Sequence, residues 1–433
     1  MPPMFSKIER TLSENISVTE FSAQWKTPSD IFSVLLLLGG DIVSRALAQL
    51  AGSRLTPVAF SFGWVAFAVT TVVAVVGEKK LMPPADFPCK VINGETGYIR
   101  DNRSWIIGRL VRDFDNWMDK QPRVHAQPNS TPDSNPKPVQ KCVQEITDAK
   151  WKALKESAKE KKQPEPGRPR KAGLCVSIYR AQRAIKSYPG YDAPYITGIL
   201  TTIVQLGISA IPFGLSGNWG IFLVTAVGIV LSFSTGALSQ WSKEKWACRS
   251  STTKTFILTS GNGSQHAIVI ESNGTGLDLE DLAANDPGMV ASYKTRLAIT
   301  ALGALWIILL ITAAGIQQDT WFLLAVGALG ILQNVYAAGA SRLPMAFGVP
   351  LEFVEVIGDL KVMDTLFRVE DLYPCLGKSL LPVFFPGELD ERERVKWKGF
   401  DNIAKLKRES KKQKKEGAAS HRKGSQSKSE PKN

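Results

Sequence analysis

The chain has 433 residues, of which 44% are hydrophobic and 21% are charged, and its net charge is +13. The positive excess is confined to two segments: residues 148–171 hold nine Lys and Arg against four acidic residues, and residues 405–433 hold eleven against three. Because the rest of the chain is neutral, a basic folded face that binds nucleic acid is not indicated, and we expect no nucleic-acid partner.

The apolar residues fall into six blocks, each close to the ~20 residues that cross a bilayer as a helix. The blocks lie at 31–52, 57–76, 195–214, 218–238, 297–316 and 320–339. Short connections join them in pairs. We therefore predict a mainly α, polytopic helical membrane protein of six spans, arranged as three hairpins at 31–76, 195–238 and 297–339. The alternative is a large soluble protein with buried helices, which six such blocks disfavour.

The charges next to the blocks predict the orientation of the spans. The short connections, SRLT, SGN and QQDT, hold one Arg and one Asp between them, whereas Lys and Arg are frequent at the other ends of the blocks. Positive residues near span ends face the cytoplasm. We therefore predict that the N-terminal segment 1–30, both long loops and the C-terminus are cytosolic. The first block contains charges and is the weakest of the six spans.

The loops and the C-terminal region predict a small cytosolic α+β cap. In the loop 77–194, an amphipathic helix over 102–119 suits the headgroup region of a membrane, with packing on another cytosolic element as an equal alternative. A disordered basic linker follows it, in which a charged helix is the only element expected. The loop 239–296 contains a β-hairpin signal at 254–271. The segment 340–399 predicts a strand and a helix, and the lysine-rich tail 400–433 is predicted to be disordered.

Polar residues inside the predicted spans are candidate site residues, because polar groups in hydrocarbon are costly. Asp41, Arg45 and Gln49 follow one another at intervals of four, so they share one helix face. Gln205, Gln333 and Asn334 complete the set. These residues form either a polar pathway or a self-neutralised Asp–Arg pair with amides that join neighbouring helices. The structural interpretation is favoured, since Asp41 is the only mid-span carboxylate.

The sequence lacks motifs for catalysis, cofactors or metals. The glycines of SGNGSQH at 260–266 fit a hairpin turn rather than a nucleotide-binding loop. The histidines, His125, His266 and His421, form no HExxH motif, and no GxSxG elbow occurs. The five scattered cysteines favour neither disulfides nor zinc. Cys248, just after a span, is a candidate for reversible acylation. We expect no catalytic residue, cofactor or metal ligand.

Several segments together carry a resemblance to a known group of proteins. The chain resembles a family of filamentous-fungal multispan integral membrane proteins that has no assigned activity. The resemblance implies a fungal source and a membrane location, and it implies no reaction. It covers most of 31–385 and rests on GGDIVSRALAQLAG, TPVAFSFGWVAFA, GYIRDNRSWIIGRLVRDF, TGALSQWSKEKWACR, GNGSQHAIVI, TWFLLAVGALGILQNV and LEFVEVIG.

These features favour a non-enzymatic membrane scaffold or sensor whose cytosolic cap meets a protein partner. The basic segments are expected to be attracted to anionic lipid of the cytosolic leaflet. One alternative is a small-molecule transporter or channel that uses the polar face of the first span. A weaker alternative is a membrane-bound accessory enzyme of lipid or secondary metabolism.

Overall fold

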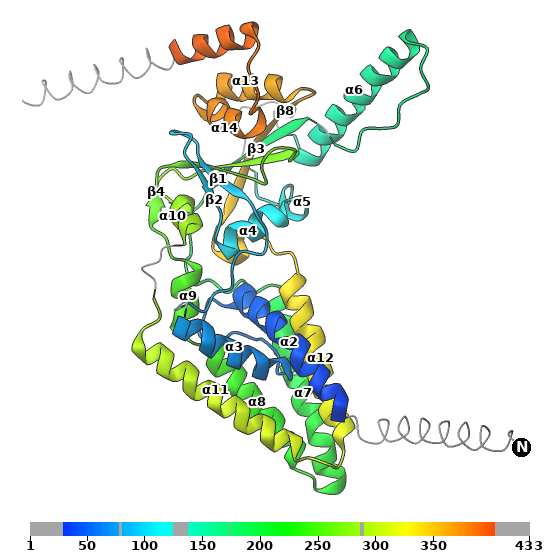
Figure 1. Cartoon of the computed structure of the whole chain (residues 1–433), viewed down its shortest axis with the longest axis vertical. Coiled ribbons are helices and arrows are strands. Elements are labelled where there is room, and N and C mark those ends of the chain that lie inside the picture. Colours follow the sequence, from blue (N-terminus) through cyan, green and yellow to red (C-terminus); the bar gives the residue numbers. More distant parts are fainter. Residues whose placement is uncertain (1–28, 78–79, 124–136, 172, 286–289, 403–433) are drawn as a thin grey trace, which may run out of the picture.

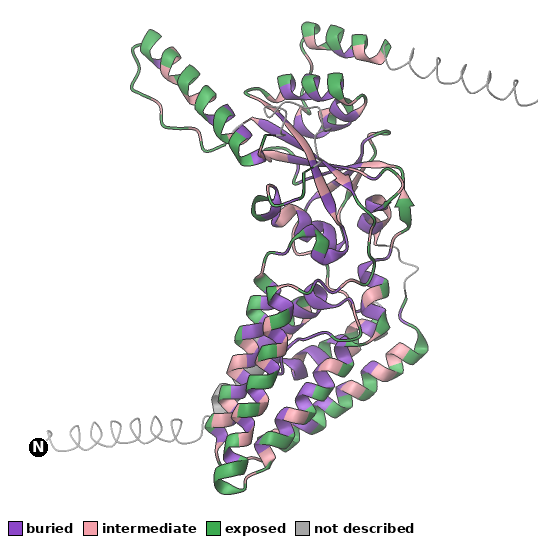
Figure 2. Ribbon diagram, turned by 180° about the vertical axis from the view of Figure 1, so that it is seen from behind, coloured by how far each residue is buried: buried purple, intermediate pink, exposed green. Residues whose placement is uncertain are grey.

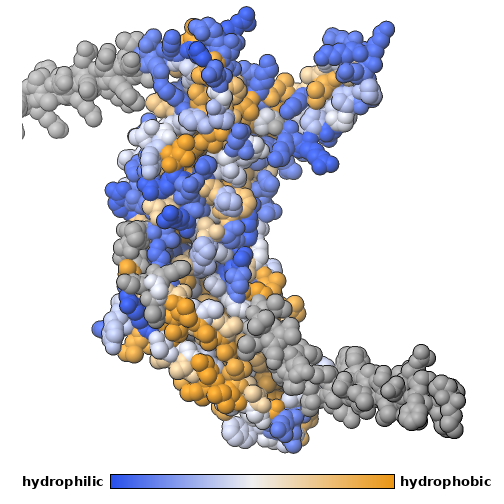
Figure 3. Space-filling view, viewed as in Figure 1, coloured by the Kyte–Doolittle hydropathy of each residue, from blue (hydrophilic) through white to orange (hydrophobic). Residues whose placement is uncertain are grey.

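The protein consists of two parts stacked along its long axis, a bundle of helices and an α/β cap (Figure 1). On the face shown in Figure 3, the bundle is largely hydrophobic and the cap largely hydrophilic. The computed structural model describes residues 29–77, 80–123, 137–171, 173–285 and 290–402. Most of the predicted N-terminal segment and nearly all of the predicted tail therefore lie outside the described residues.

The bundle consists of apolar helices that share one core. They are α2 (Ser29–Leu50), α3 (Gly63–Gly77), α7 (Ala193–Ser216), α8 (Gly220–Gly236), α11 (Tyr293–Ala314) and α12 (Thr320–Gly339). In that core the ring of Trp306 stacks on Phe60 and Trp64, with centroids 6.1 and 5.3 Å apart. Within the described residues, α7, α11 and α12 are long and apolar enough to cross a membrane, and α8 with α9 (Ser239–Lys245), bent by 42°, would be a fourth. These helices support a membrane-type bundle, but six spans are not confirmed.

The second predicted span is only partly helical, which corrects the prediction for 57–76. Residues 51–62 form no helix, with bends at 52–54, and only 56–62 are buried inside the bundle before α3 begins at Gly63. We call residues 51–62 the extended segment. At 1.5 Å per residue, the 15 residues of α3 measure about 22 Å, less than the ~30 Å hydrocarbon core of a bilayer. Pro57 has no N–H to donate to a helix. Glycines of neighbouring helices make room: a Cβ on Gly330 of α12 would lie 1.7 Å from the Phe60 carbonyl oxygen.

The first helix pair also differs from the other two in the position of its connection. Asp319 accepts hydrogen bonds from Ser216 and Asn218, so the α7–α8 and α11–α12 connections meet at the end of the bundle remote from the cap (Figure 1). The SRLT turn lies at the opposite end, where α2 and α12 finish next to each other. α2 therefore begins at the remote end. The prediction that all three connections share one side is wrong for the first.

In the described part of the chain, the cap is built on a six-stranded sheet with the order β2-β1-β5-β6-β3-β8. The strands are β1 (Lys90–Asn93), β2 (Ile99–Asp101), β3 (Leu174–Ala181), β5 (Thr255–Thr259), β6 (His266–Glu271) and β8 (Leu351–Asp359). β3 and β6 are parallel, and the other neighbours are antiparallel. The predicted hairpin is β5–β6, and the predicted strand after the last block is β8. β3 lies in the loop 77–194, beyond the predicted linker, where the sequence predicted no element; most of the linker itself lies outside the described residues.

Helices cover both faces of this sheet. α4 (Trp105–Arg112), α5 (Phe114–Trp117) and α10 (Leu279–Ala284) share a core with one face, and α13 (Val362–Leu372) and α14 (Leu376–Phe384) share a core with the other. β4 (Ser250–Thr252) and β7 (Gly276–Leu277) form a separate small pair. The predicted interfacial helix 102–119 is wrong as a membrane-surface element, because its apolar face is buried in the cap (Figure 2).

α6 (Val139–Glu160) contains the predicted charged helix and packs only its first half on the cap. Cys142 and Ile146 are buried next to Cys175 of β3, whereas the second half projects away from the bundle (Figures 1 and 2). The chain that follows returns beside it, and Trp151 Nε1 donates to the Pro166 carbonyl at 3.1 Å. We call residues 148–171 the basic arm.

Candidate functional site

The bundle and the cap meet where two helices of the bundle end. The last carbonyls of a helix have no partner within the helix, and its C-terminal end carries partial negative charge. Lys245 of α9 donates to the carbonyl oxygens of Gln49 at 3.0 Å and Ala51 at 2.7 Å. Arg342 also donates to the Gln49 carbonyl, at 2.6 Å, and pairs with Asp192. Two buried basic side chains therefore cap the end of α2. Burial, together with the neighbouring Arg342 and Arg109, holds the pKa of Lys245 well below its usual value.

The end of α12 is capped in the same way, by a residue of the cap. Arg109 of α4 donates to the Ala338 carbonyl at 2.8 Å and lies 2.9 Å from the carboxylate of Asp86. Its guanidinium also lies 4.5 Å from the centre of the Trp105 ring. Burial lowers the pKa of Arg109 to about 10, an effect that Asp86 opposes, so the side chain remains a cation at neutral pH.

Gln49 connects the two capped ends. Its Oε1 accepts a hydrogen bond from Trp105 Nε1 at 3.1 Å, and its Nε2 donates to the Ala340 carbonyl at 3.0 Å. This one amide therefore joins α2, α4 and the chain just after α12. We call the four buried side chains that meet here the junction cluster: Gln49, Arg109, Lys245 and Arg342.

The structure separates the polar face that the sequence predicts on α2. Asp41 and Arg45 form an ion pair of 2.8 Å, but their side chains are 70% and 46% exposed. The expectation that this pair faces the bundle interior is wrong. The inward face of α2 carries Gly40 and Leu47, and a Cβ on Gly40 would lie 3.2 Å from Ala66 of α3. Only Gln49 of the predicted three residues is buried.

Two of the other predicted polar residues, Asn334 and Gln205, hold the extended segment 51–62 in place, and Gln333 joins α12 to α7. Asn334 accepts from the Ala59 N–H at 3.0 Å and donates to the Ala59 carbonyl at 2.9 Å. Gln205 donates to the Phe60 carbonyl at 2.7 Å and to a carbonyl of α12 at 2.9 Å. Gln333 donates to the hydroxyl of Thr197 at 3.0 Å. These contacts favour the structural interpretation of amides that join neighbouring parts of the chain.

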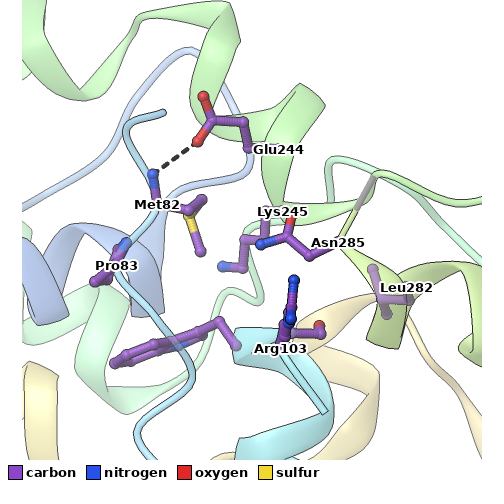
Figure 4. A pocket seen from close by; sticks show the side chains of 9 residues that line it. Met82, Pro83, Arg103, Glu244, Lys245, Leu282 and Asn285 are labelled. Carbon is purple, nitrogen blue, oxygen red and sulfur yellow. Dashed lines mark hydrogen bonds between the residues drawn. The ribbon is translucent and has the colours of Figure 1, made fainter. Parts of the chain in front are cut away.

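Two hollows lie near the junction. The one in Figure 4 lies between Met82, Arg103, Lys245 and Asn285 and has a volume of about 10 Å³, room for about one water molecule. Beside it, Glu244 accepts from the Met82 N–H at 2.7 Å. The larger hollow measures about 350 Å³, which is within the size range of small-ligand sites. Its lining is Gly52, Ser53, Arg54, Ser187, Gly236, Ala237, Leu238, Ser239, Trp241 and Ser242.

The titratable groups of the cap do not form a recognisable catalytic arrangement. His266 Nε2 lies 3.8 Å from Asp115, but burial lowers the pKa of His266, which favours a neutral ring. Burial raises the pKa of the Cys248 thiol to about 11, so little reactive thiolate forms at neutral pH. Among the described residues, no group of three or more His, Cys, Asp or Glu side chains could hold a metal ion. Acylation of Cys248 stays a prediction.

Comparison of the chain with protein-family models, with curated proteins and with solved structures finds no match.

The three basic residues of the junction cluster were not predicted as site residues. In the sequence, Lys245 and Arg342 follow apolar blocks and count only as signals of orientation. A more specific signal was available: a basic residue shortly after a helix can reach the unpaired carbonyls of a helix end. Which helix end it reaches depends on tertiary contacts. Lys245 caps α2, which lies nearly 200 positions earlier in the chain.

Proposed function

We propose that this protein is a non-enzymatic membrane platform. Its bundle lies in a bilayer, and its cap presents the basic arm to a negatively charged protein partner. The apolar helices support the membrane location, and the buried basic side chains of the junction cluster support a cap that is held firmly on the bundle. Hydrogen bonds to charged groups contribute about 1.5–3 kcal/mol each, so a cluster of them resists separation of the two parts.

We further propose that α2, α7, α8, α11 and α12 cross the bilayer. The segment 51–77 would enter the bilayer from the cap side and leave it on the same side. Lys80, Lys243 and Lys294 lie near the cap end of the bundle, whereas Asp319 marks the remote end. Positive residues near span ends favour the cytoplasm. The cap would then be cytosolic, and the N-terminus would lie on the opposite side of the membrane from the cap. This differs from the expectation of two cytosolic termini.

The basic arm is the single observation that carries the proposed partner binding. Its outer half buries little, and Leu154 is 41% exposed, so folding of the cap does not account for it. Two of its cations are already paired, Arg168 with Asp148 and Lys155 with Glu165. Exposed cations without a described ion-pair partner remain along it, among them Lys152, Lys159 and Arg170. A protruding element with this charge attracts an acidic surface and orients its approach.

Proximity labelling tests this proposal directly. A biotin ligase is fused to the C-terminus of the full chain, and labelled neighbours are compared with those of the variant Lys152→Glu, Lys159→Glu, Arg170→Glu. The control variant, Arg183→Glu, Lys361→Glu, Lys398→Glu, changes the net charge equally at exposed positions away from both the arm and the span ends. We expect the arm variant to lose a set of acidic neighbours that the control keeps. Equal label sets in all three proteins would refute the proposed role of the arm.

The extended segment favours a second candidate, a small-molecule channel or transporter. Non-helical backbone at membrane depth occurs where it is buried in protein or lines a cavity, and broken helices carry the sites of many transporters. Gln205 Oε1 and Thr225 Oγ1 are buried there without a partner among the described residues. Liposomes that contain the purified protein would then swell in glycerol or urea faster than empty liposomes, and Gln205→Met would change that rate. No difference from empty liposomes would reject conduction of these solutes.

A further inference from the structure

The larger hollow lies between the cap ends of α7 and α8, where the chain enters the bundle. Thr56 of the entering segment donates to the Gly236 carbonyl of α8 at 3.0 Å, and Tyr195 of α7 donates to the Leu55 carbonyl at 3.2 Å. Ser53 and Arg54 precede these contacts and line the hollow. The bend between α8 and α9 provides the opposite wall, through residues 236–242. Under the topology proposed above, this level is the boundary between hydrocarbon and headgroups.

The lining combines one cation with free hydroxyl donors. Arg54 is the only charged residue of the lining, and no ion pair of its guanidinium is found among the described residues. Ser53 uses its hydroxyl proton within the segment, on the Leu55 carbonyl. Ser187 and Ser242 share one hydrogen bond, which leaves one of their two protons free. The lining thus offers a guanidinium and hydroxyl protons, and it contains no carboxylate that would repel an anion.

Apolar surface continues from the hollow along the bundle. Leu238 and Trp241 form part of the lining itself. On the flanking helices Ile196 of α7 is 50% exposed and Val230 of α8 is 61% exposed, and Leu55 of the entering segment is 45% exposed. A ligand that fits both regions carries an anionic group at one end and hydrocarbon at the other. A guanidinium with hydroxyl donors matches a phosphate, whose oxygens accept several hydrogen bonds at once.

We propose that this hollow binds the phosphate of an anionic phospholipid with a small headgroup, with Arg54 as its ion partner and the acyl chains along α7 and α8. The proposal rests on the membrane location in the proposed function but not on the role of the basic arm. Choline would add a second cation beside Arg54. Phosphatidylcholine is therefore the disfavoured lipid, and phosphatidic acid is the favoured one.

Native mass spectrometry of the full chain, released from nanodiscs of equal phosphatidic acid and phosphatidylcholine, tests the site. We expect the wild-type protein to retain phosphatidic acid at least fivefold over phosphatidylcholine. Arg54→Gln should bring this ratio close to one, whereas Lys294→Gln, an exposed cation at the cap end of α11, should leave it unchanged. Equal retention of both lipids by the wild type, or an unchanged ratio in Arg54→Gln, would overturn the proposal.

A bound lipid is distinguished from a soluble phosphate by adding inorganic phosphate to lipid-free protein in detergent. Stabilisation that depends on Arg54 would show a site for soluble phosphate and would overturn the lipid assignment. The melting temperature of Arg54→Gln in detergent checks that the variant is folded, and Arg54→Lys, which keeps the charge, should restore part of the preference. Carbonate extraction tests the membrane location itself, so loss of lipid preference in a carbonate-resistant protein counts against the site alone.

Discussion

Replacing Asn334 by Leu removes the amide that holds the extended segment inside the bundle. Asn334 Oδ1 is the acceptor for the Ala59 N–H at 3.0 Å, and Asn334 Nδ2 donates to the Ala59 carbonyl at 2.9 Å. The carbonyl keeps a second donor, because Trp64 Nε1 lies 2.9 Å from the same oxygen. The substitution therefore leaves mainly one buried group, the Ala59 N–H, without a partner. An unsatisfied buried donor costs about 1–3 kcal/mol, so we expect destabilisation of about 2 kcal/mol.

Gln333 offers a matched comparison on the same helix. Gln333→Leu removes donors to the Thr197 hydroxyl and the Pro194 carbonyl, at 3.0 and 3.3 Å. Thr197 also donates to the Ala193 carbonyl at 2.8 Å, so its hydroxyl keeps a partner after the substitution. Side-chain hydrogen bonds between helices in membranes average about 0.6 kcal/mol. We expect Gln333→Leu to cost about that amount, several-fold less than Asn334→Leu.

Unfolding by SDS in mixed micelles, followed by tryptophan fluorescence, measures both variants against the wild type. Trp64 shares its acceptor with Asn334, so its environment reports on the segment itself. Asn334→Leu should lower the free energy of unfolding clearly more than Gln333→Leu. If the two variants lose the same free energy, or if Asn334→Leu is neutral, the extended segment does not depend on this amide and the reasoning is refuted.

Three further predictions concern the bundle, a thiol pair and the arm. Gly330→Ala should reduce the yield of monodisperse protein on gel filtration, since its Cβ would meet a carbonyl oxygen at 1.7 Å, whereas Gly339→Ala, with open space around it, should not; equal yields contradict this. Contact with Cys175 lowers the pKa of Cys142, so methanethiosulfonate labelling of Cys142 should begin at a lower pH in the wild type than in Cys175→Ala; identical profiles contradict the contact. Trp151→Ala should release the returning chain of the arm and speed tryptic cleavage within 161–171 at an unchanged melting temperature, and an unaltered cleavage rate would show that this contact is dispensable.

The sequence is sufficient to predict most of the bundle but not the segment 57–62. In the last four apolar blocks, the hydrophobic run and the helix coincide, because apolar residues lie on all sides of each helix. Residues 57–62 are equally apolar, and hydropathy does not distinguish a helix from an extended chain that neighbours enclose. The deciding contacts, such as that of Gly330 with Phe60, join residues about 270 positions apart. Pro57 alone was a local signal of the break.

The cap shows the same limit in another form. The hairpin β5–β6 is recognisable because its two strands and its turn are adjacent in sequence. β3 is not recognisable in this way, because its partners are distant in sequence. Two helices of the bundle separate β3 from β6, and four separate it from β8. The amphipathic face at 102–119 was recognised correctly, but periodicity does not identify what covers that face. Here the sheet covers that face. Phe114 and Trp117 lie in the core with it, and their rings pack edge to face with centroids 5.0 Å apart.

The predicted polar residues of the spans differ in their burial and in their partners. Gln49, Gln205 and Asn334 are all fully buried, and each bonds a carbonyl or an N–H that no regular helix or strand satisfies. Asp41 and Arg45 differ because they neutralise each other within one helical turn and need no partner elsewhere. Asp41, Arg45 and Gln49 are evenly spaced on α2, but Asp41 and Arg45 form an exposed ion pair, whereas Gln49 is buried in the junction cluster.

The position of the junction cluster has a consequence for how the two parts of the molecule depend on each other. The C-terminal ends of α2 and α12 carry partial negative charge and unpaired carbonyls. If the cap were a separate, flexible part, water would have to bind these carbonyls. Instead, Arg109 comes from the cap and Lys245 comes from the short helix between bundle and cap. A cap that moved away would take Arg109 from the Ala338 carbonyl and Trp105 from the Gln49 side chain. Folding of the cap and closure of the bundle are therefore coupled, as the proposed platform would require.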